Sequence, residues 1–148
     1  MPERLEFFFD FASPYSYLAH SQLGGLGAEV AVRPMQVLKV MEAVGNQPTT
    51  IQSAAKARYA FADLTRWARR YDVPLNPGRM RTNDAGACAR AVLAAGRLGQ
   101  AREATAALFH AFWGEAAALR TIFVGADMFF GNDRLDFVRE RLAQPVAA

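Results

Sequence analysis

The apolar positions at the start of the chain follow a strand–helix–strand pattern. Apolar side chains recur at every second position over residues 5–11, which predicts a strand. Residues 14–23 predict a helix that ends at a glycine pair, and residues 29–33 predict a second strand that ends at a proline. Because one short helix joins the two strands, we expect them to be parallel, as in a βαβ unit.

The middle of the chain has the periodicity of helices. A break rich in proline interrupts it at residues 73–78. The predicted helices are residues 35–44, 52–71, 84–98 and 101–113.

The pattern returns to strands near the end of the chain. Residues 121–124 and 128–130, on either side of a Gly-Ala-Asp turn, predict a β-hairpin, and residues 134–142 predict a last helix. The order is therefore βαβ, then helices, then ββα. It predicts an α/β fold with a thioredoxin-like core. Residues 1–34 and 120–148 would form this core, and residues 35–119 would form an all-helical insertion.

Composition narrows the classes of function. The 148 residues are 52% hydrophobic and 21% charged, which is typical of a globular domain. The formal charge is +3 with arginines spread through the predicted helices, so we expect no nucleic-acid partner. No apolar run approaches the ~20 residues of a membrane helix, so we expect no membrane association. Cys88 is the only cysteine, which leaves no intrachain disulfide and no cysteine-based metal site, and a cytoplasmic location is expected.

The junction between the first predicted strand and helix has features of an anion-binding site. Ser13 stands at the N-cap position and Pro14 at the first helical position, where its missing N–H group costs nothing. The N–H groups of a first helical turn have no partners within the helix, and the helix dipole places about half a positive charge there. On local sequence alone, a Ser-Pro pair is also the ordinary start of a helix with no further role.

Four sequence blocks resemble those of 2-hydroxychromene-2-carboxylate isomerases and the related kappa-class glutathione transferases. They are FDFASPYSYL at residues 9–18, GNQP at 45–48, KARYAFADLTRWA at 56–68 and FFGNDRLDF at 129–137. The blocks occur in the order found in that family and span nearly the whole chain.

The resemblance implies a glutathione site. It implies that Ser13 donates its hydroxyl to the glutathione sulfur, at the place where disulfide oxidoreductases carry a cysteine, and that Asn46 binds the peptide. It also implies contacts to glutathione from Gly131, Asn132 and Asp133, the last two at the γ-glutamyl end. A hydroxyl donor at a helix N-terminus lowers the pKa of a bound thiol, so the thiolate is nucleophilic near neutral pH.

Simpler roles are available for several of these residues. Asn132 is a good helix N-cap, and Asp133 is a favourable acid in a first helical turn. Asn46 fits a loop turn, and Tyr59 fits helix packing. The other side chains with reactive groups, which we expect to be packing or surface residues, are His20, His110 and Cys88.

The function implied by the resemblance is glutathione-dependent isomerisation of 2-hydroxychromene-2-carboxylate or a similar acid of aromatic degradation. A thiolate adds to the conjugated substrate, a double bond becomes a rotatable single bond, and elimination gives the other isomer, with no metal required. Lys39 and Tyr59 are candidate contacts to this small aromatic carboxylate substrate.

Two other functions stay open on the sequence. One is a kappa-like glutathione transferase that acts on an electrophile through nearly the same site. The other is a non-catalytic module of the thioredoxin fold that binds glutathione weakly or not at all. A disulfide oxidoreductase is disfavoured, because residues 13–16 contain no cysteine.

The chain departs from the family pattern at the bridge before the predicted hairpin. The family carries more residues there and places a proline directly before the strand, where a cis peptide lets the backbone pair with the cysteinyl part of glutathione. Here the bridge is short, and Arg120 takes the place of that proline. A non-proline cis bond costs about 2.5–4 kcal/mol, so we expect a trans peptide.

Three expectations follow from the missing proline and from the short bridge, which shortens the helical insertion. Glutathione binding should be weaker than in full-length relatives, by roughly one to two orders of magnitude, because two backbone hydrogen bonds are lost. Isomerase activity should be low or absent. A more open cleft exposes apolar surface, which favours self-association into a homodimer.

Overall fold

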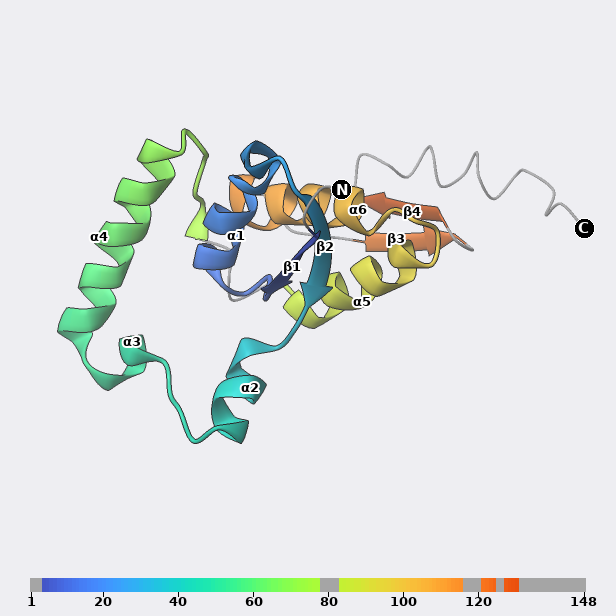
Figure 1. Ribbon diagram of the computed structural model, residues 1–148. Coiled ribbons are helices and arrows are strands. Elements are labelled where there is room, and N and C mark those ends of the chain that lie inside the picture. Colours follow the sequence, from blue (N-terminus) through green and yellow to red (C-terminus); the bar gives the residue numbers. More distant parts are fainter. Residues whose placement is uncertain (1–3, 78–82, 116–120, 125–126, 131–148) are drawn as a thin grey trace, which may run out of the picture.

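The computed structural model describes residues 4–77 and 83–115, together with the backbone of two strands at 121–124 and 127–130 (Figure 1). Within these ranges, no helix is long and apolar enough to cross a membrane.

A parallel pair of strands opens the chain. β1 (Arg4–Phe9) pairs in parallel with β2 (Glu29–Pro34). Between them lie α1 (Pro14–His20) and a 3-10 turn, η1 (Leu23–Leu26). The predicted βαβ unit is therefore confirmed. β1 ends two residues earlier than predicted, because the chain turns there towards α1.

The middle of the chain is helical, as predicted. Its elements are α2 (Val37–Ala43), α3 (Thr49–Gln52), α4 (Ala54–Arg70), α5 (Ala85–Gly96), α6 (Ala101–Phe109) and a π-helical turn, η3 (His110–Gly114). α4 starts at its own cap, because Ser53 has an extended backbone and its Oγ accepts a hydrogen bond from the Lys56 N–H group at 3.1 Å. The helix predicted at residues 52–71 is therefore α4, and the short α3 before it is a separate helix that was not predicted.

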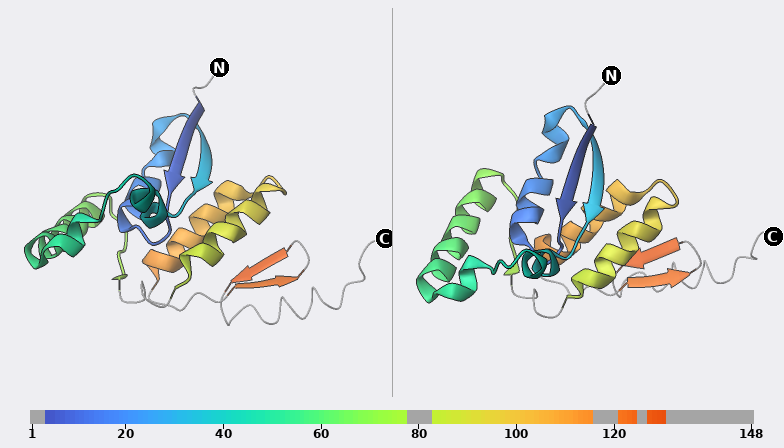
Figure 2. Two further views of the ribbon diagram at one scale, coloured as in Figure 1. Left: turned by 90° about the horizontal axis from the view of Figure 1, so that it is seen from below. Right: turned by 60° about the horizontal axis from the view of Figure 1, so that its bottom comes forward.

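The helices lie on opposite sides of the first strand pair. α5 and α6 pack against each other and against β2, while α4 contacts α1 and α3 (Figure 2). α4 lies apart from the rest of the molecule in Figure 1, and only Leu64 and Ala68 of this helix are buried.

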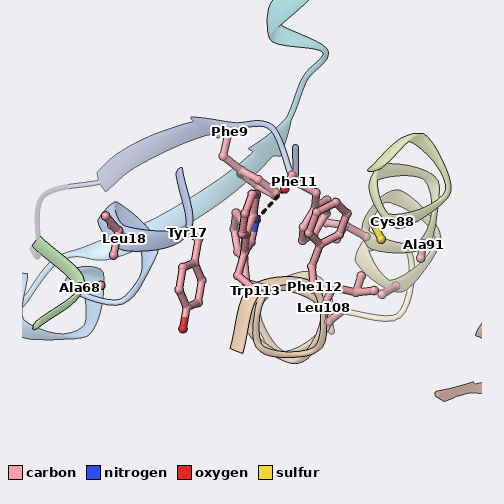
Figure 3. Close-up of a cluster of buried hydrophobic side chains, with 14 of the residues drawn as sticks. Phe9, Phe11, Tyr17, Leu18, Ala68, Cys88, Ala91, Leu108, Phe112 and Trp113 are labelled. Atoms are coloured by element: carbon pink, nitrogen blue, oxygen red, sulfur yellow. Dashed lines mark hydrogen bonds between the residues drawn. The ribbon is translucent and has the colours of Figure 1, made fainter. Parts of the chain in front are cut away.

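Aromatic side chains fill the core between α1, β1 and the end of α6. The rings of Phe9 and Phe11 both contact that of Phe109, with ring centres 5.2 and 4.6 Å apart. The Trp113 Nε1–H group donates to the Phe11 carbonyl at 2.8 Å, which joins residues 102 positions apart (Figure 3). Tyr17 of α1 adds a hydrogen bond from its hydroxyl to the Pro74 carbonyl at 2.7 Å. The chain segment around Phe11 is thus held from several sides.

The predicted hairpin is confirmed in its backbone. β3 (Thr121–Val124) and β4 (Asp127–Phe130) pair antiparallel. In the described residues this pair forms a sheet of its own and does not hydrogen-bond to β1 or β2. The predicted last helix at 134–142 lies outside the described residues. The division into a core and an insertion at residues 35–119 stays a prediction.

Candidate functional site around Ser13

Ser13 lies in a tight turn between β1 and α1. Its φ is −95° and its ψ 113°, and its N–H group donates to the Asp10 carbonyl at 3.0 Å. The Ser13 Oγ accepts a hydrogen bond from the Ser16 N–H group at 3.3 Å, and Pro14 follows as the first helical residue. The predicted helix N-cap is therefore confirmed.

The Ser13 hydroxyl still has a proton to donate. The bond from Ser16 uses a lone pair of the oxygen and leaves the O–H group unengaged. Among the described residues, no acceptor takes this proton. The hydroxyl can therefore donate to an acceptor from outside the chain while it caps the helix. Since residues 13–16 contain no cysteine, a thiol that reacts at this turn has to come from a ligand.

A buried carboxylate behind this turn was not predicted from the sequence. Asp10 is 8% exposed. Its Oδ1 accepts from the Ala12 N–H group at 2.9 Å, and its Oδ2 accepts from the Val37 N–H group at 2.8 Å. The first contact is a local aspartate turn, which sequence could have indicated. The second joins residues 27 positions apart, and no local pattern reveals it.

Two tyrosines lie on helices that contact each other, α1 and α4. Tyr15 belongs to α1 and Tyr59 to α4. Burial raises the pKa of Tyr15, and the negative charges of Asp63 and of ionised Tyr59 raise it further. Tyr15 therefore keeps its proton near neutral pH and can donate a hydrogen bond. Tyr59, a predicted substrate contact, is 66% exposed and so is accessible to a ligand.

Asn46 lies in the turn that ends α2. Gly45 has φ +69°, and its N–H group donates to the Glu42 carbonyl at 3.1 Å. The Asn46 N–H group donates to the Met41 carbonyl at 2.8 Å, which completes a Schellman motif. The Asn46 Oδ1 accepts from the Gln47 N–H group at 2.8 Å, so the side chain helps to form the turn. Its contact to a peptide ligand stays a prediction.

The other predicted site residues are not joined to Ser13 by a described contact. The Lys39 side chain is exposed on α2 and makes no hydrogen bond or ion pair with the described residues. Gly131, Asn132 and Asp133 lie outside the described residues, so their contacts to glutathione stay predictions. The same holds for the trans peptide expected before Arg120.

His20 and Cys88 pack, as expected. The His20 ring contacts the rings of Phe7 and Phe109, with ring centres 6.3 and 5.1 Å apart. Burial lowers the pKa of His20, and the charge of Arg102 lowers it further. Cys88 is buried in α5, and burial raises the pKa of its thiol to about 12. This thiol is therefore protonated and unreactive near neutral pH.

Comparison with known proteins agrees with the predicted resemblance. Over 120 residues the chain is 37% identical to a protein of Sphingobium xenophagum named 2-hydroxychromene-2-carboxylate isomerase, which covers 77% of this chain and 60% of that protein. A protein of the same name from Pseudomonas putida is 32% identical over 125 residues, covering 77% and 58%. Glutathione S-transferase kappa 1 of Caenorhabditis elegans is 34% identical over 79 residues, covering 50% and 34%. The chain therefore spans 58–60% of the length of these two isomerases.

A family model and a solved structure agree on the fold. A solved 2-hydroxychromene-2-carboxylate isomerase superposes with a TM-score of 0.62 at 23% identity, over 95% of this chain and 94% of the other. This likeness concerns the fold alone. The model of the DSBA-like thioredoxin domain matches residues 4–122. With four-fifths of its length matched, the chain belongs to the family of DSBA-like thioredoxin domains.

Proposed function

We propose that this chain is a glutathione-dependent isomerase acting on 2-hydroxychromene-2-carboxylate or a similar acid of aromatic degradation. The observation that carries the proposal is the Ser13 hydroxyl, which caps α1 with its oxygen and keeps its proton for a ligand. The names of the two isomerases support the substrate class, and the kappa-class relative supports the use of glutathione.

The residues of the Ser13 turn suit a thiol ligand. A hydroxyl donor and the first turn of a helix both favour a negative charge on sulfur, and the turn offers no competing cysteine. Bound glutathione would supply the thiolate that adds to a conjugated double bond, allows rotation about it and leaves again. Ser13 would hold the sulfur by donating its proton in a hydrogen bond, and it would itself neither gain nor lose a covalent bond.

The remaining contacts in the proposal follow the sequence predictions. The peptide would be held by Asn46, Gly131, Asn132 and Asp133. The Asp133 carboxylate suits the α-ammonium group of glutathione. Tyr59, on the helix that contacts α1, would meet the aromatic substrate, and Lys39 would hold its carboxylate. A homodimer is proposed as well, and it is supported by exposed apolar side chains on the segment α2–α4. They are Leu38, Val40, Val44, Ile51 and Phe61.

A kappa-like transferase is the second candidate, and the match to the Caenorhabditis elegans protein favours it. It would use the same Ser13 contact and differ in the electrophile. A non-catalytic module is the third, favoured by the short bridge before β3 and by Arg120 at the place of the family's proline. Substrate turnover separates the first two candidates, and glutathione binding without turnover indicates the third.

The proposal is tested by following the conversion of 2-hydroxychromene-2-carboxylate with and without glutathione. Glutathione should be present at millimolar concentration, because its affinity is expected to be weak. The proposal predicts slow turnover that depends on glutathione and is lost in Ser13→Ala. Turnover of an electrophile such as a haloarene, without isomerisation, would favour the transferase instead.

A further inference from the structure

Asp10 is the one charged side chain that is buried among the described residues. Both of its carboxylate oxygens are engaged by backbone N–H groups, at 2.9 Å from Ala12 and 2.8 Å from Val37. Hydrogen bonds from N–H groups to an ionised carboxylate are short and strong, and here they take the place of the lost contacts with water. A buried acid with this arrangement holds two backbone segments together.

The two segments belong to different parts of the candidate site. Ala12 precedes Ser13 directly, and Val37 is the first residue of α2, which ends at the turn of Asn46. The residue at the N-cap of α2, Gln36, makes no side-chain hydrogen bond to the helix. Asp10 therefore satisfies a free N–H group of α2 from a distant part of the chain.

The backbone of Asp10 also fixes the Ser13 turn. Its carbonyl accepts from the Ser13 N–H group at 3.0 Å, and its N–H group donates to the Ser16 Oγ at 3.3 Å. The neighbouring Phe9 carbonyl accepts from the Met35 N–H group at 2.7 Å. The position of the Ser13 hydroxyl and the start of α2 thus depend on the same two residues at the end of β1.

We propose that Asp10 is a positioning residue for the glutathione site, which holds the Ser13 hydroxyl and the α2–Asn46 segment at a fixed spacing around one peptide ligand. The inference rests on the proposed function, because glutathione is the ligand that both parts would contact. In this proposal Asp10 contacts neither glutathione nor the substrate. It changes the pKa of a bound thiol only by fixing the position of the Ser13 hydroxyl.

The test compares wild type with Asp10→Asn, which has the same shape but only one acceptor oxygen for two N–H groups. Two quantities are measured, the dissociation constant of glutathione by calorimetry and the pKa of the bound thiol by ultraviolet absorbance of the thiolate. We expect the dissociation constant to rise by about tenfold, which is the change in affinity that the loss of one hydrogen bond causes. We also expect the pKa of the bound thiol to rise. Neither readout depends on turnover.

A double variant shows whether Asp10 acts through Ser13. In a Ser13→Ala background, Asp10→Asn should cause no further rise in the pKa of the bound thiol. An equal rise in both backgrounds would mean that Asp10 acts only on the fold, and it would overturn the inference.

Thr105→Val is the matched control for the loss of a buried polar group. The Thr105 hydroxyl is buried and donates to the Ala101 carbonyl within α6 at 2.7 Å, apart from the Ser13 turn. This variant should lose stability and leave the pKa of the bound thiol unchanged. If Asp10→Asn does not fold, Asp10→Glu replaces it. Its longer carboxylate keeps the charge but displaces both N–H contacts, so the same rise in pKa is expected.

The remaining outcomes separate the inference from the proposed function. Suppose that wild type binds glutathione, and that Asp10→Asn, or Asp10→Glu in its place, has the same dissociation constant and the same pKa of the bound thiol. The inference is then overturned, and the proposed function stands. If wild type does not bind glutathione, both are overturned together.

Discussion

At the scale of single residues, Ser13 serves both the fold and the proposed chemistry with one hydroxyl group. Its oxygen accepts from Ser16 and so caps α1, and its proton is left for a ligand. The two roles use different atoms of the same group, so a substitution that removes the hydroxyl removes both. Their effects can be separated by a second serine that has only the first role.

Ser13→Ala should lower the free energy of unfolding by about 1 kcal/mol, because a helix cap is lost. It should also weaken glutathione binding and raise the pKa of the bound thiol, because the donor to sulfur is gone. Urea unfolding and glutathione calorimetry measure the two effects.

Ser53→Ala is the control, since Ser53 caps α4 in the same way through the Lys56 N–H group. It should lose similar stability and keep glutathione binding. Equal glutathione affinity in the two variants would remove Ser13 from the site.

His20 gives a prediction on pH. Its pKa is lowered in the folded chain by burial and by Arg102, from the ordinary value of 6.5 in the unfolded chain. The unfolded chain then binds more protons in the window between the lowered pKa and 6.5. The stability from neutral His20 is therefore complete above pH 6.5 and is lost as the pH falls through that window.

His20→Phe keeps a ring against Phe7 and Phe109 and removes the titrating group. Urea unfolding on both sides of pH 6.5 should show a smaller loss of stability towards acid in this variant than in wild type. Parallel pH profiles of the two proteins would show that His20 does not titrate in this way.

At the scale of elements, the turn after α2 depends on Gly45 with φ +69°. An L residue in the left-handed region costs about 1–2 kcal/mol, so Gly45→Ala should reduce the free energy of unfolding by roughly that amount. Gly24→Ala is the control, because Gly24 lies in η1 with open space around it and without a left-handed φ. Thermal or urea unfolding that shows the same loss for both variants would contradict the role of the turn.

The sequence predicts an element well when the interactions that form it are between residues close together in the chain. The βαβ unit and the Ser13 cap were predicted, because alternation and a Ser-Pro pair are short-range signals. The separate α3 was missed although its cause is local, because the Ser53 cap of α4 falls inside a stretch of helical periodicity. The role of Asp10 was missed as well, because its bond to Val37 spans 27 positions.

At the scale of the whole molecule, one aromatic core joins the first strand to the end of α6. The bond from Trp113 to Phe11 spans 102 positions, so it ties the start of the chain to the turn that follows α6. The sequence indicated which side of each strand and helix is apolar, but it could not show which of these sides pack against each other. The site therefore sits on a turn that the rest of the chain holds in place.

The reactivity of the Cys88 thiol tests whether this core is closed to solvent. Its thiol is buried, and its pKa is raised to about 12 by burial. A disulfide reagent at mildly basic pH should therefore react with Cys88 far more slowly in the native protein than in urea, because only an opened core exposes a thiolate. Equal rates in the two conditions would show that the region around Cys88 is not closed.

The central claim is that the Ser13 turn binds glutathione and holds its sulfur as a thiolate. Calorimetric titration of wild type with glutathione, repeated in buffers of different ionisation enthalpy, tests it most directly. The account predicts saturable binding weaker than micromolar, accompanied by release of a proton near neutral pH. No saturable heat at millimolar glutathione, or binding without proton release, would contradict it.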